Sequence, residues 1–257
     1  MKEIKALAKE FLELILSSKH SVAFTGAGIS TESGIPDYRS PGTGVWERMD
    51  QSVVSLEGFY RSPEKYYRYA LEMDEIRSKA KPNAAHRLLA ELEVRGLLLG
   101  VITQNVDGLH QSAGSQRVYE LHGSLREAEC LTCGSLFPMD GVMERVRGGE
   151  IPPACTECGS RLLKPRAVFF GEALPQETWH GAMRLVKGCD LLIVIGSSLL
   201  VSPANILPEV ALTSGAKLVI INLMPTPYDG RATLTVGERV GEFAEEVLCL
   251  LAAMGRQ

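Results

Sequence analysis

The sequence predicts an α/β protein with a doubly wound parallel sheet and a smaller domain made of a helical insertion and a four-cysteine zinc module. Short apolar runs that alternate with helical stretches predict the sheet. Polar side chains at the ends of those runs predict a ligand site, and two Cys-x-x-Cys pairs predict the zinc module. A chain of 257 residues is long enough for one large domain with an insertion.

The expected strands are short apolar runs bounded by polar or turn-forming residues. Four are clear and two are weaker: Ser21–Thr25, Leu98–Thr103, Leu191–Ile195 and Lys217–Asn222, then Val118–Leu121 and Ala167–Phe170. Helical stretches lie between most of them. In Asn83–Arg95, for example, Pro82 suits a helix start and Gly96 a helix stop. Parallel sheets of this kind bind ligands at the carboxyl ends of their strands.

Two segments interrupt the alternation of strands and helices. Residues 42–81 are polar and aromatic with no clear strand, and residues 125–164 contain the paired cysteines. We therefore expect a Rossmann-like domain formed by residues 1–41, 82–124 and 165–257. The helical insertion would occupy 42–81 and the zinc-binding module 125–164.

Composition and charge exclude several classes of protein. The chain has 27 basic and 31 acidic residues, and this net charge of −4 argues against direct nucleic-acid binding. No run approaches the roughly 20 apolar residues that span a bilayer. The first 20 residues read as an amphipathic surface helix rather than a signal peptide, because Glu3, Glu10 and Glu13 interrupt the apolar positions. We expect a cytoplasmic monomer with no membrane partner.

The paired cysteines indicate a metal site. Cys130 and Cys133 form one Cys-x-x-Cys pair, Cys155 and Cys158 form the other, and a glycine follows each pair. In a reducing compartment such pairs favour metal over disulfide, and redox pairs do not come in twos at this spacing. Four thiolates make the closed tetrahedral site of structural zinc, so we expect one Zn²⁺ without a catalytic role.

The polar candidates for ligand binding follow the expected strands. They are Gly26, Ala27, Gly28 and Ser30; Gln104, Asn105 and Asp107; Gly196, Ser197 and Ser198; and Asn222. Such groups suit recognition of phosphate, ribose and carboxamide, and glycine lets a backbone approach a phosphate closely. The usual dinucleotide glycine fingerprint is absent, however, and each polar residue taken alone is more typical of turns and helix caps.

One histidine has the context of a general base. His122 follows the expected strand Val118–Leu121 and precedes a glycine, so its ring can reach a cleft. Imidazole titrates near neutral pH, which suits proton transfer. His86 and His110 lie beside apolar residues in expected helices and are interpreted as structural.

Together these stretches resemble the sirtuins, the Sir2-type NAD⁺-dependent deacylases. The matching segments occur in the family's order and cover nearly the whole chain. They are Gly26–Arg39, Lys81–His86, Val101–Gly114, Glu120–Ser124, the two cysteine pairs, Val168–Glu172, Gly196–Ala204 and Asn222. Each motif alone is modest, but the combination is specific.

The resemblance implies that NAD⁺ is the co-substrate. The implied cofactor-binding residues are Gly26, Ala27, Gly28, Ser30, Asp37, Tyr38, Arg39, Gln104, Asn105, Asp107, Gly196, Ser197, Ser198, Asn222 and Val240. Asp37, Tyr38 and Arg39 would lie in a mobile loop over the cofactor, and Tyr38 stands where the family usually has phenylalanine. Ser197 likewise replaces the more usual threonine.

The resemblance also implies the reaction. The acyl-lysine carbonyl oxygen attacks the anomeric carbon, nicotinamide leaves, and free lysine and O-acyl-ADP-ribose result. His122 would be the general base, with Asn105 and Asp107 as the other catalytic residues. The acylated peptide would pair as an added strand with a segment of five residues. These are Val168, Phe169, Phe170, Gly171 and Glu172.

The absence of one motif narrows the range of acyl groups that we expect the protein to remove. Sirtuins that remove succinyl or malonyl groups carry a Tyr-x-x-Arg pair, and Tyr66–Arg77 contains none. Acetyl is therefore the first choice. A mono-ADP-ribosyltransferase and a long-chain or lipoyl-type deacylase remain alternatives. A non-catalytic zinc-ribbon binding module would explain the cysteines, but not Gly26–Arg39 or His122.

Overall fold

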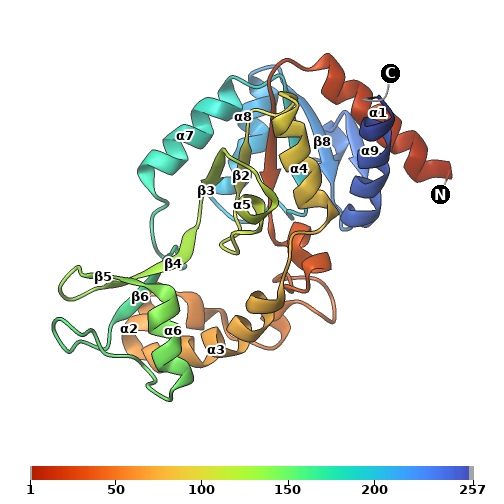
Figure 1. Cartoon of the computed structure of the whole chain (residues 1–257). Coiled ribbons are helices and arrows are strands. Elements are labelled where there is room, and N and C mark those ends of the chain that lie inside the picture. The colour runs from red at the N-terminus through yellow and green to blue at the C-terminus, as the bar shows by residue number, and fades with distance from the viewer. Residues whose placement is uncertain (1, 255–257) are drawn as a thin grey trace. The chain divides into compact units, whose positions relative to one another are not determined.

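The structure, a computed structural model, describes residues 2–254. By internal packing these residues divide into two compact units, which are both visible in Figure 1. Unit 1 contains residues 2–33, 81–121 and 177–254. Unit 2 contains residues 34–80 and 122–176. Each unit has a sheet and a hydrophobic core of its own.

Among the described residues, a parallel sheet of six strands forms the centre of unit 1. Its order is β3-β2-β1-β7-β8-β9, and every neighbouring pair is parallel. The strands are β1 (Ser21–Thr25), β2 (Val101–Thr103), β3 (Val118–Glu120), β7 (Leu191–Ile195), β8 (Lys217–Ile221) and β9 (Leu234–Val236). The chain winds in one direction from β1 to β3 and in the other from β7 to β9. This confirms the doubly wound sheet and places its switch point between β1 and β7.

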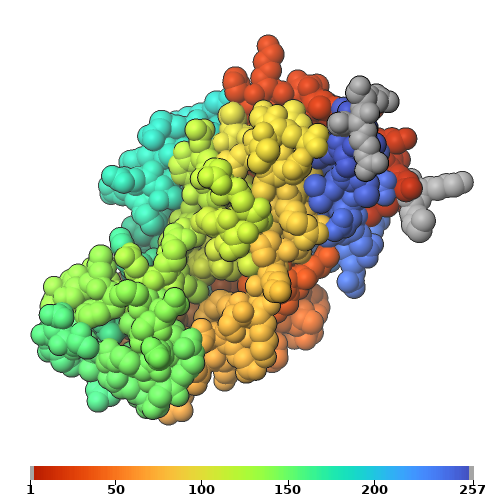
Figure 2. Space-filling view, viewed as in Figure 1, coloured from red at the N-terminus to blue at the C-terminus, as the bar shows by residue number. Residues whose placement is uncertain are grey.

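Helices cover both faces of this sheet (Figure 1). The helices of the first face are α1 (Lys2–Ser17), α4 (Ala84–Val94) and α9 (Val240–Met254), and those of the second are α7 (Gln176–Lys187) and α8 (Leu207–Thr213). Successive residues of β7 alternate between the faces: Ile193 packs in the first core and Val194 in the second. α4 and α9 lie side by side on the surface in Figure 2. No helix in the described part of the chain combines the length and apolar character that crossing a membrane requires.

Short elements follow the strands of unit 1. The 3-10 helix η1 (Ala27–Ser33) comes directly after β1, and the short helix α5 (Leu109–Ala113) comes after β2. Two further 3-10 helices are η4 (Ala204–Ile206) and η5 (Asp229–Arg231). These connections carry the polar residues that the sequence predicts as ligand-binding.

Unit 2 combines an antiparallel sheet of order β5-β4-β6 with helices. Its elements are η2 (Val45–Glu47), η3 (Gln51–Val54), α2 (Leu56–Arg61), α3 (Pro63–Lys79), β4 (Gly123–Cys130), β5 (Leu136–Pro138), α6 (Met139–Arg147) and β6 (Leu163–Ala167). Its core joins Phe59 and Tyr67 with Met143 and Phe169. The Tyr67 hydroxyl also donates to the carbonyl of Leu163, at 2.7 Å.

Both expected insertions, 42–81 and 125–164, lie within unit 2. That unit also takes in neighbouring residues, among them His122 and the segment 168–172, which the sequence analysis assigned to the Rossmann-like domain. Because β4 pairs with β6, the chain on both sides of the cysteines belongs to one sheet, and the unit is correspondingly larger than the two insertions.

Two strand predictions need correction. β2 begins at Val101 rather than Leu98, because Gly100 has a φ of 155° and interrupts the extended run. The strand expected at Ala167–Phe170 is wrong, since β6 occupies Leu163–Ala167 instead. The charged and proline residues in the middle of β6 hide it from a search for apolar runs. β9 has only three residues and escapes the same search.

Candidate active site and metal centre

Four cysteine thiols converge in unit 2. The Sγ atoms of Cys130 and Cys158 lie 3.6 Å apart, and those of Cys133 and Cys155 lie 3.7 Å apart. All four sulfur atoms lie within 4.8 Å of one another. Zn–S bonds of about 2.3 Å in a tetrahedron place sulfur atoms about 3.8 Å apart, so the thiols fit one Zn²⁺. An ion held by four thiolates has no position for water, and its role is structural.

The two cysteine pairs lie on turns of the same construction. The N–H of Gly134 donates to the carbonyl of Cys130, and the N–H of Gly159 donates to the carbonyl of Cys155, both at 2.8 Å. The two glycines have φ values of 77° and 76°. This left-handed conformation favours glycine, and it closes each Cys-x-x-Cys segment into a tight loop around one metal position.

The glycine-rich turn after β1 packs directly against the turn after β7. The N–H of Gly28 donates to the carbonyl of Gly196 at 2.8 Å, and the N–H of Gly26 donates to the carbonyl of Ile195 at 3.0 Å. A Cβ atom on Gly196 would lie 2.2 Å from the backbone nitrogen of Ile29. The close approach of two backbones therefore requires these glycines. Because the N–H groups of Gly26 and Gly28 are already used, other groups of the loop would have to donate to a phosphate.

Three predicted site residues form one hydrogen-bonded cluster at the carboxyl ends of β1 and β2. The Nδ2 of Asn105 donates to the Oγ of Ser30 at 3.1 Å, and that hydroxyl donates to the Oδ2 of Asp107 at 2.7 Å. The other carboxylate oxygen of Asp107 accepts from the N–H of Leu109 at 2.9 Å. Ser30 and Asn105 are both buried. The cluster offers an amide, a hydroxyl and a carboxylate beside the switch point.

A second contact joins the turns after β2 and β7. The Nε2 of Gln104 donates to the Oγ of Ser197 at 2.8 Å, and the same hydroxyl accepts from the N–H of Leu199 at 3.3 Å. Leu199 has a φ of 57°, which is uncommon for a residue with a side chain. Ser197 is buried and Ser198 is half-buried. The structure thus brings Gln104 and Ser197, predicted separately, into direct contact.

Asn222 and Val240 lie farther along the same sheet, after β8 and at the start of α9. The side chain of Asn222 donates to the carbonyl of Met224 at 2.6 Å, so it shapes its own turn. Val240 is buried in the core beneath the first helical face. A contact of Val240 with a cofactor stays a prediction.

The loop that contains Asp37, Tyr38 and Arg39 belongs to unit 2. The carboxylate of Asp37 accepts from the backbone N–H groups of Arg39 and Ser40, at 3.0 and 2.7 Å, and so forms a turn. The ring of Tyr38 stacks on Trp46, with centroids 4.8 Å apart and planes 26° apart. Arg39 is exposed. Asp37 therefore organises the loop, Tyr38 packs on Trp46, and Arg39 has an exposed side chain.

His122 and the segment 168–172 are neighbours in unit 2. The carbonyl of His122 accepts from the N–H of Val168 at 2.8 Å. Phe170 uses both of its backbone groups internally: its N–H donates to Val54 and its carbonyl accepts from Leu56, each at 2.9 Å. The segment forms an isolated bridge here rather than a strand. An incoming peptide would have to pair with the other residues of the segment.

Lys164 is a buried residue that the sequence analysis missed. Its ammonium donates to the carbonyls of Pro165 and Ala167, at 3.0 and 2.7 Å, and pairs with the Glu172 carboxylate at 2.8 Å. It also lies 4.3 Å from the centre of the Phe169 ring. Burial lowers the pKa of Lys164, and the contact with Glu172 opposes that shift. A lysine in a charged strand ordinarily faces solvent, so no pattern in the sequence points to this one, although it fixes the shape of the segment.

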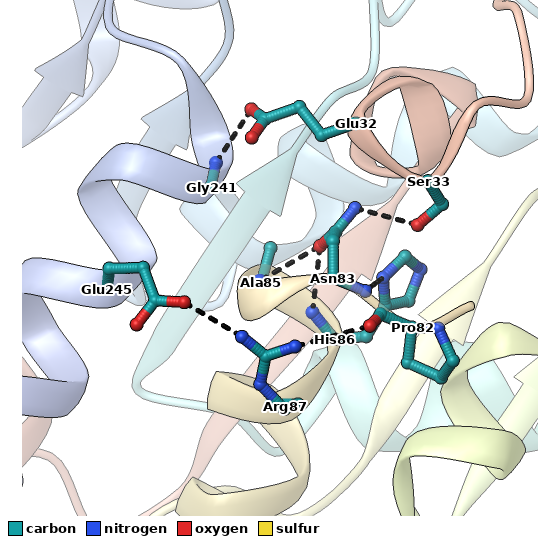
Figure 3. Close-up of polar contacts among 9 residues, drawn as sticks. All are labelled: Glu32, Ser33, Pro82, Asn83, Ala85, His86, Arg87, Gly241 and Glu245. Carbon is teal, nitrogen blue, oxygen red and sulfur yellow. Dashed lines mark hydrogen bonds and ion pairs between the residues drawn. The ribbon is translucent and has the colours of Figure 1, made fainter. Parts of the chain in front are cut away.

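Asn83, at the start of α4, was also missed as a contributor to the site. Figure 3 shows its amide reaching toward η1, where the Nδ2 donates to the Ser33 hydroxyl at 3.0 Å. The same nitrogen donates to the carbonyl of Ile29 at 2.7 Å. From the same 3-10 helix, Glu32 accepts from the N–H of Gly241 at 2.9 Å. The first turns of α4 and α9 are thereby tied to the loop that carries Ser30.

Comparison with known proteins gives a consistent result. Residues 26–203 match the model of the Sir2 family. The chain is 48% identical over 236 residues to the NAD-dependent protein deacetylase 2 of Caldanaerobacter subterraneus subsp. tengcongensis, a match that covers 91% of this chain and 92% of that protein. It is 47% identical over 240 residues to the NAD-dependent protein deacetylase of Thermotoga maritima, covering 93% and 96% of the two chains.

A solved structure of Sir2 with a p53 peptide and NAD⁺ has the same fold. It superposes with a TM-score of 0.89 at 46% identity, and the match covers 95% of this chain and 98% of the other. The family model alone spans more than half of the chain, from the glycine-rich turn to the segment after β7. The chain therefore belongs to the Sir2 family.

Proposed function

We propose that the protein removes acyl groups, acetyl first, from lysine side chains of proteins with NAD⁺ as co-substrate, giving nicotinamide and O-acyl-ADP-ribose. The observation that carries the proposal is the hydrogen-bonded cluster of Ser30, Asn105 and half-buried Asp107 beside the switch point of the sheet in a Sir2 family chain. Relatives named as NAD-dependent deacetylases, and the Sir2 structure with a peptide and NAD⁺, support it.

The chemistry of the unit 1 residues suits the two halves of NAD⁺. When bound, NAD⁺ supplies a ribose carbon activated by its bond to nicotinamide. The amides of Gln104 and Asn105 suit a carboxamide, and the carboxylate of Asp107 would stabilise positive charge that develops at the ribose. Ser197 and Ser198, after β7, would serve the adenosine half. All of these side chains follow strands of one sheet, which holds them with little freedom.

His122 would act as the general base. Its backbone is held by the Val168 N–H, at the place where β3 leads into β4. The imidazole would accept a proton from a ribose hydroxyl of the co-substrate and pass it to solvent.

The acyl-lysine peptide would bind along the segment 168–172. The Lys164–Glu172 ion pair holds this segment in shape, and the ring of Phe170, 43% exposed, lies 6.0 Å from that of Trp46. Aromatic rings favour a neutral acyl group over a charged one. Succinyl and malonyl groups are therefore expected to be poor substrates.

We also propose that the protein works in the cytoplasm as a monomer, with an acylated protein and NAD⁺ as its partners and without a membrane partner. Its net charge of −4 supports the absence of direct nucleic-acid binding.

The test is mass spectrometry of an acetyl-lysine peptide incubated with the protein, with and without NAD⁺. We expect deacetylation only with NAD⁺, together with free nicotinamide and O-acetyl-ADP-ribose. ADP-ribose attached to protein in place of these products would assign transferase activity instead. Loss of longer acyl groups but not acetyl would assign a long-chain deacylase.

The matched variants are His122→Ala and His180→Ala, the second on the exposed surface of α7. Removing a general base costs about 10²- to 10⁴-fold in turnover, so His122→Ala should lose that much while His180→Ala keeps wild-type turnover. Near-wild-type turnover in His122→Ala would contradict the assigned base.

A further inference from the structure

Two buried histidines lie beneath the Asn105 cluster, and the reaction described above uses neither. His86 is in the first turn of α4 and His110 is in α5. Their relative exposures are 0% and 1%. The ring centres are 4.9 Å apart and the planes are inclined by 58°. Two titratable rings packed together inside a sheet protein are costly to bury unless both are neutral and hydrogen-bonded.

The hydrogen bonds define which ring nitrogens carry protons. The N–H of Asn83 donates to the Nδ1 of His86 at 3.4 Å, a contact drawn in Figure 3, so the proton of neutral His86 is on Nε2. The Nε2 of His110 lies 2.9 Å from the Oγ1 of Thr25, which itself donates to Thr103. His110 therefore donates through Nε2, and its Nδ1 is an acceptor.

The two remaining ring nitrogens complement each other. Among the described residues, buried His86 Nε2 and buried His110 Nδ1 have no hydrogen-bond partner. One is a donor and the other an acceptor, and they belong to rings in contact. No hydrogen bond joins these two nitrogens, so each stays an unpaired buried polar atom, which is rare in folded proteins. Protonation of either ring would add a buried N–H donor without an acceptor.

A continuous line of hydrogen bonds runs from His110 to the Asn105 cluster. His110 donates to Thr25 at 2.9 Å, and Thr25 donates to Thr103 at 2.8 Å. The Thr103 hydroxyl accepts from the backbone N–H of Asn105 at 3.0 Å. The Asn105 side chain then reaches Ser30 at 3.1 Å. Every residue in this line is buried.

We propose that His110, backed by His86, is a positioning residue that sets the Asn105 turn for the nicotinamide half of NAD⁺. The inference rests on the function proposed above. His110 does not touch the co-substrate in this proposal. It fixes the direction of the Thr25 and Thr103 hydroxyls, and these hold the backbone from which the Asn105 amide projects.

The surroundings keep both rings neutral. Burial, with a further contribution from His86, lowers the pKa of His110 to about 3. Burial also lowers the pKa of His86 to about 4, helped by the neighbouring Arg87 and opposed by Asp107. For His86, burial outweighs the opposing effect of the Asp107 carboxylate. The line of hydrogen bonds therefore keeps the same direction at neutral pH.

The test compares two variants that interrupt the line of hydrogen bonds with one variant that can preserve it. His110→Leu removes the donor, and Thr25→Val removes the next hydroxyl while keeping its shape. His110→Gln can place an amide donor where the Nε2 was. Loss of a group that orients a ligand-binding residue usually lowers affinity or activity about ten- to a hundredfold. We expect kcat/KM for NAD⁺ to fall by that factor in His110→Leu and Thr25→Val. We expect His110→Gln to restore it. NAD⁺ affinity is measured in parallel by calorimetry, which needs no turnover.

The matched control is Leu92→Ala, which removes a buried side chain from α4 itself without touching the polar line. It should lower Tm and leave kcat/KM for NAD⁺ unchanged. Equal kinetic losses in Leu92→Ala and Thr25→Val, or no rescue by His110→Gln, would overturn the positioning role. Absence of deacylation in the wild-type protein would defeat the proposed function alone, because the calorimetric comparison would still stand.

The ring protons give a readout that a merely structural role would not produce. In ¹⁵N NMR of histidine-labelled protein, both rings should appear as neutral Nε2–H tautomers that persist to pH 5. Thr25→Val should shift the His110 signals and leave those of His20 unchanged. A charged ring, or an Nδ1–H tautomer at His110, would overturn the assignment.

Discussion

The glycines that follow β1 and β7 are required by close backbone packing within the fold, independently of any ligand. The Gly26 and Gly28 turn contacts the backbone of Gly196 so closely that no Cβ atom fits. The same contact fixes the distance between the turns that carry Ser30 and Ser197. Glycine at these positions is therefore needed to place Ser30 and Ser197.

Gly196→Ala tests that demand. The new Cβ would lie 2.2 Å from the nitrogen of Ile29, at a φ of 62°. We expect a loss of about 3 kcal/mol or more in the free energy of unfolding, measured with urea. The control is Gly215→Ala, which has a φ of 87° and open space around it, and should lose only about 1–2 kcal/mol. Equal losses would mean that backbone strain, not overlap, explains the glycine.

At this scale the sequence predicts the residues that bear chemistry better than the residues that support them. Asn105, Asp107 and Ser30 follow strands, and the rule for parallel sheets brings them together. Thr25 and Lys164 give no such signal. A threonine ending a strand and a lysine within one are ordinary, and only the packing shows that both side chains are buried.

Among the elements, the two zinc knuckles repeat one hydrogen-bond pattern at two places in the chain. β4 leads into the first knuckle and β6 leaves the second, so the metal position joins strands that already pair. Sequence predicts the knuckles from spacing alone. It does not predict β4, β5 or β6, because their residues are mixed in polarity and follow no apolar run.

Cys130→Ala should release zinc and destabilise unit 2. Three thiolates bind the ion far less tightly than four. We expect zinc content to fall from one ion per chain to none and stability to drop by at least about 3 kcal/mol, a fraction of the roughly 10–16 kcal/mol that zinc contributes in small domains. Metal analysis and urea unfolding measure the two quantities. Cys249→Ala, on the exposed surface of α9, is the control and should keep both. A stable, zinc-free Cys130→Ala protein would contradict the structural role.

For the molecule as a whole, the buried histidines couple stability to pH. Their pKa values, about 4 for His86 and about 3 for His110, lie below the ordinary value of 6.5. Between these limits the unfolded chain binds more protons than the folded one. Stability is therefore fully present above about pH 6.5 and falls as the pH drops toward 4, by up to about 1.4 kcal/mol per pH unit for each ring.

Urea unfolding between pH 7 and pH 4.5 measures this slope. The carboxylate of Glu150, with a pKa lowered to about 2 chiefly by its hydrogen bond with Arg145, loses its contribution only below its ordinary value of 4.5. Glu150 therefore does not contribute to the slope above about pH 4.5, where the two histidines do. His180→Gln, at an exposed position, should leave the slope unchanged. A stability that is flat from pH 7 to 4.5 would mean that the rings are not buried as neutral groups.

The interleaving of the two units has a consequence for synthesis of the chain. Phe59 and Tyr67 belong to the same core as Phe169, and β1 pairs with β7. Each early segment therefore emerges on the order of 100 residues before its partner, which is on the order of 10 s at ordinary rates of translation. During that interval the aromatic side chains of α2 and α3 lack Phe169, and β1 lacks one of its two neighbouring strands. Nascent chains of this protein would consequently be clients for a holding chaperone until β6 and β7 have left the ribosome.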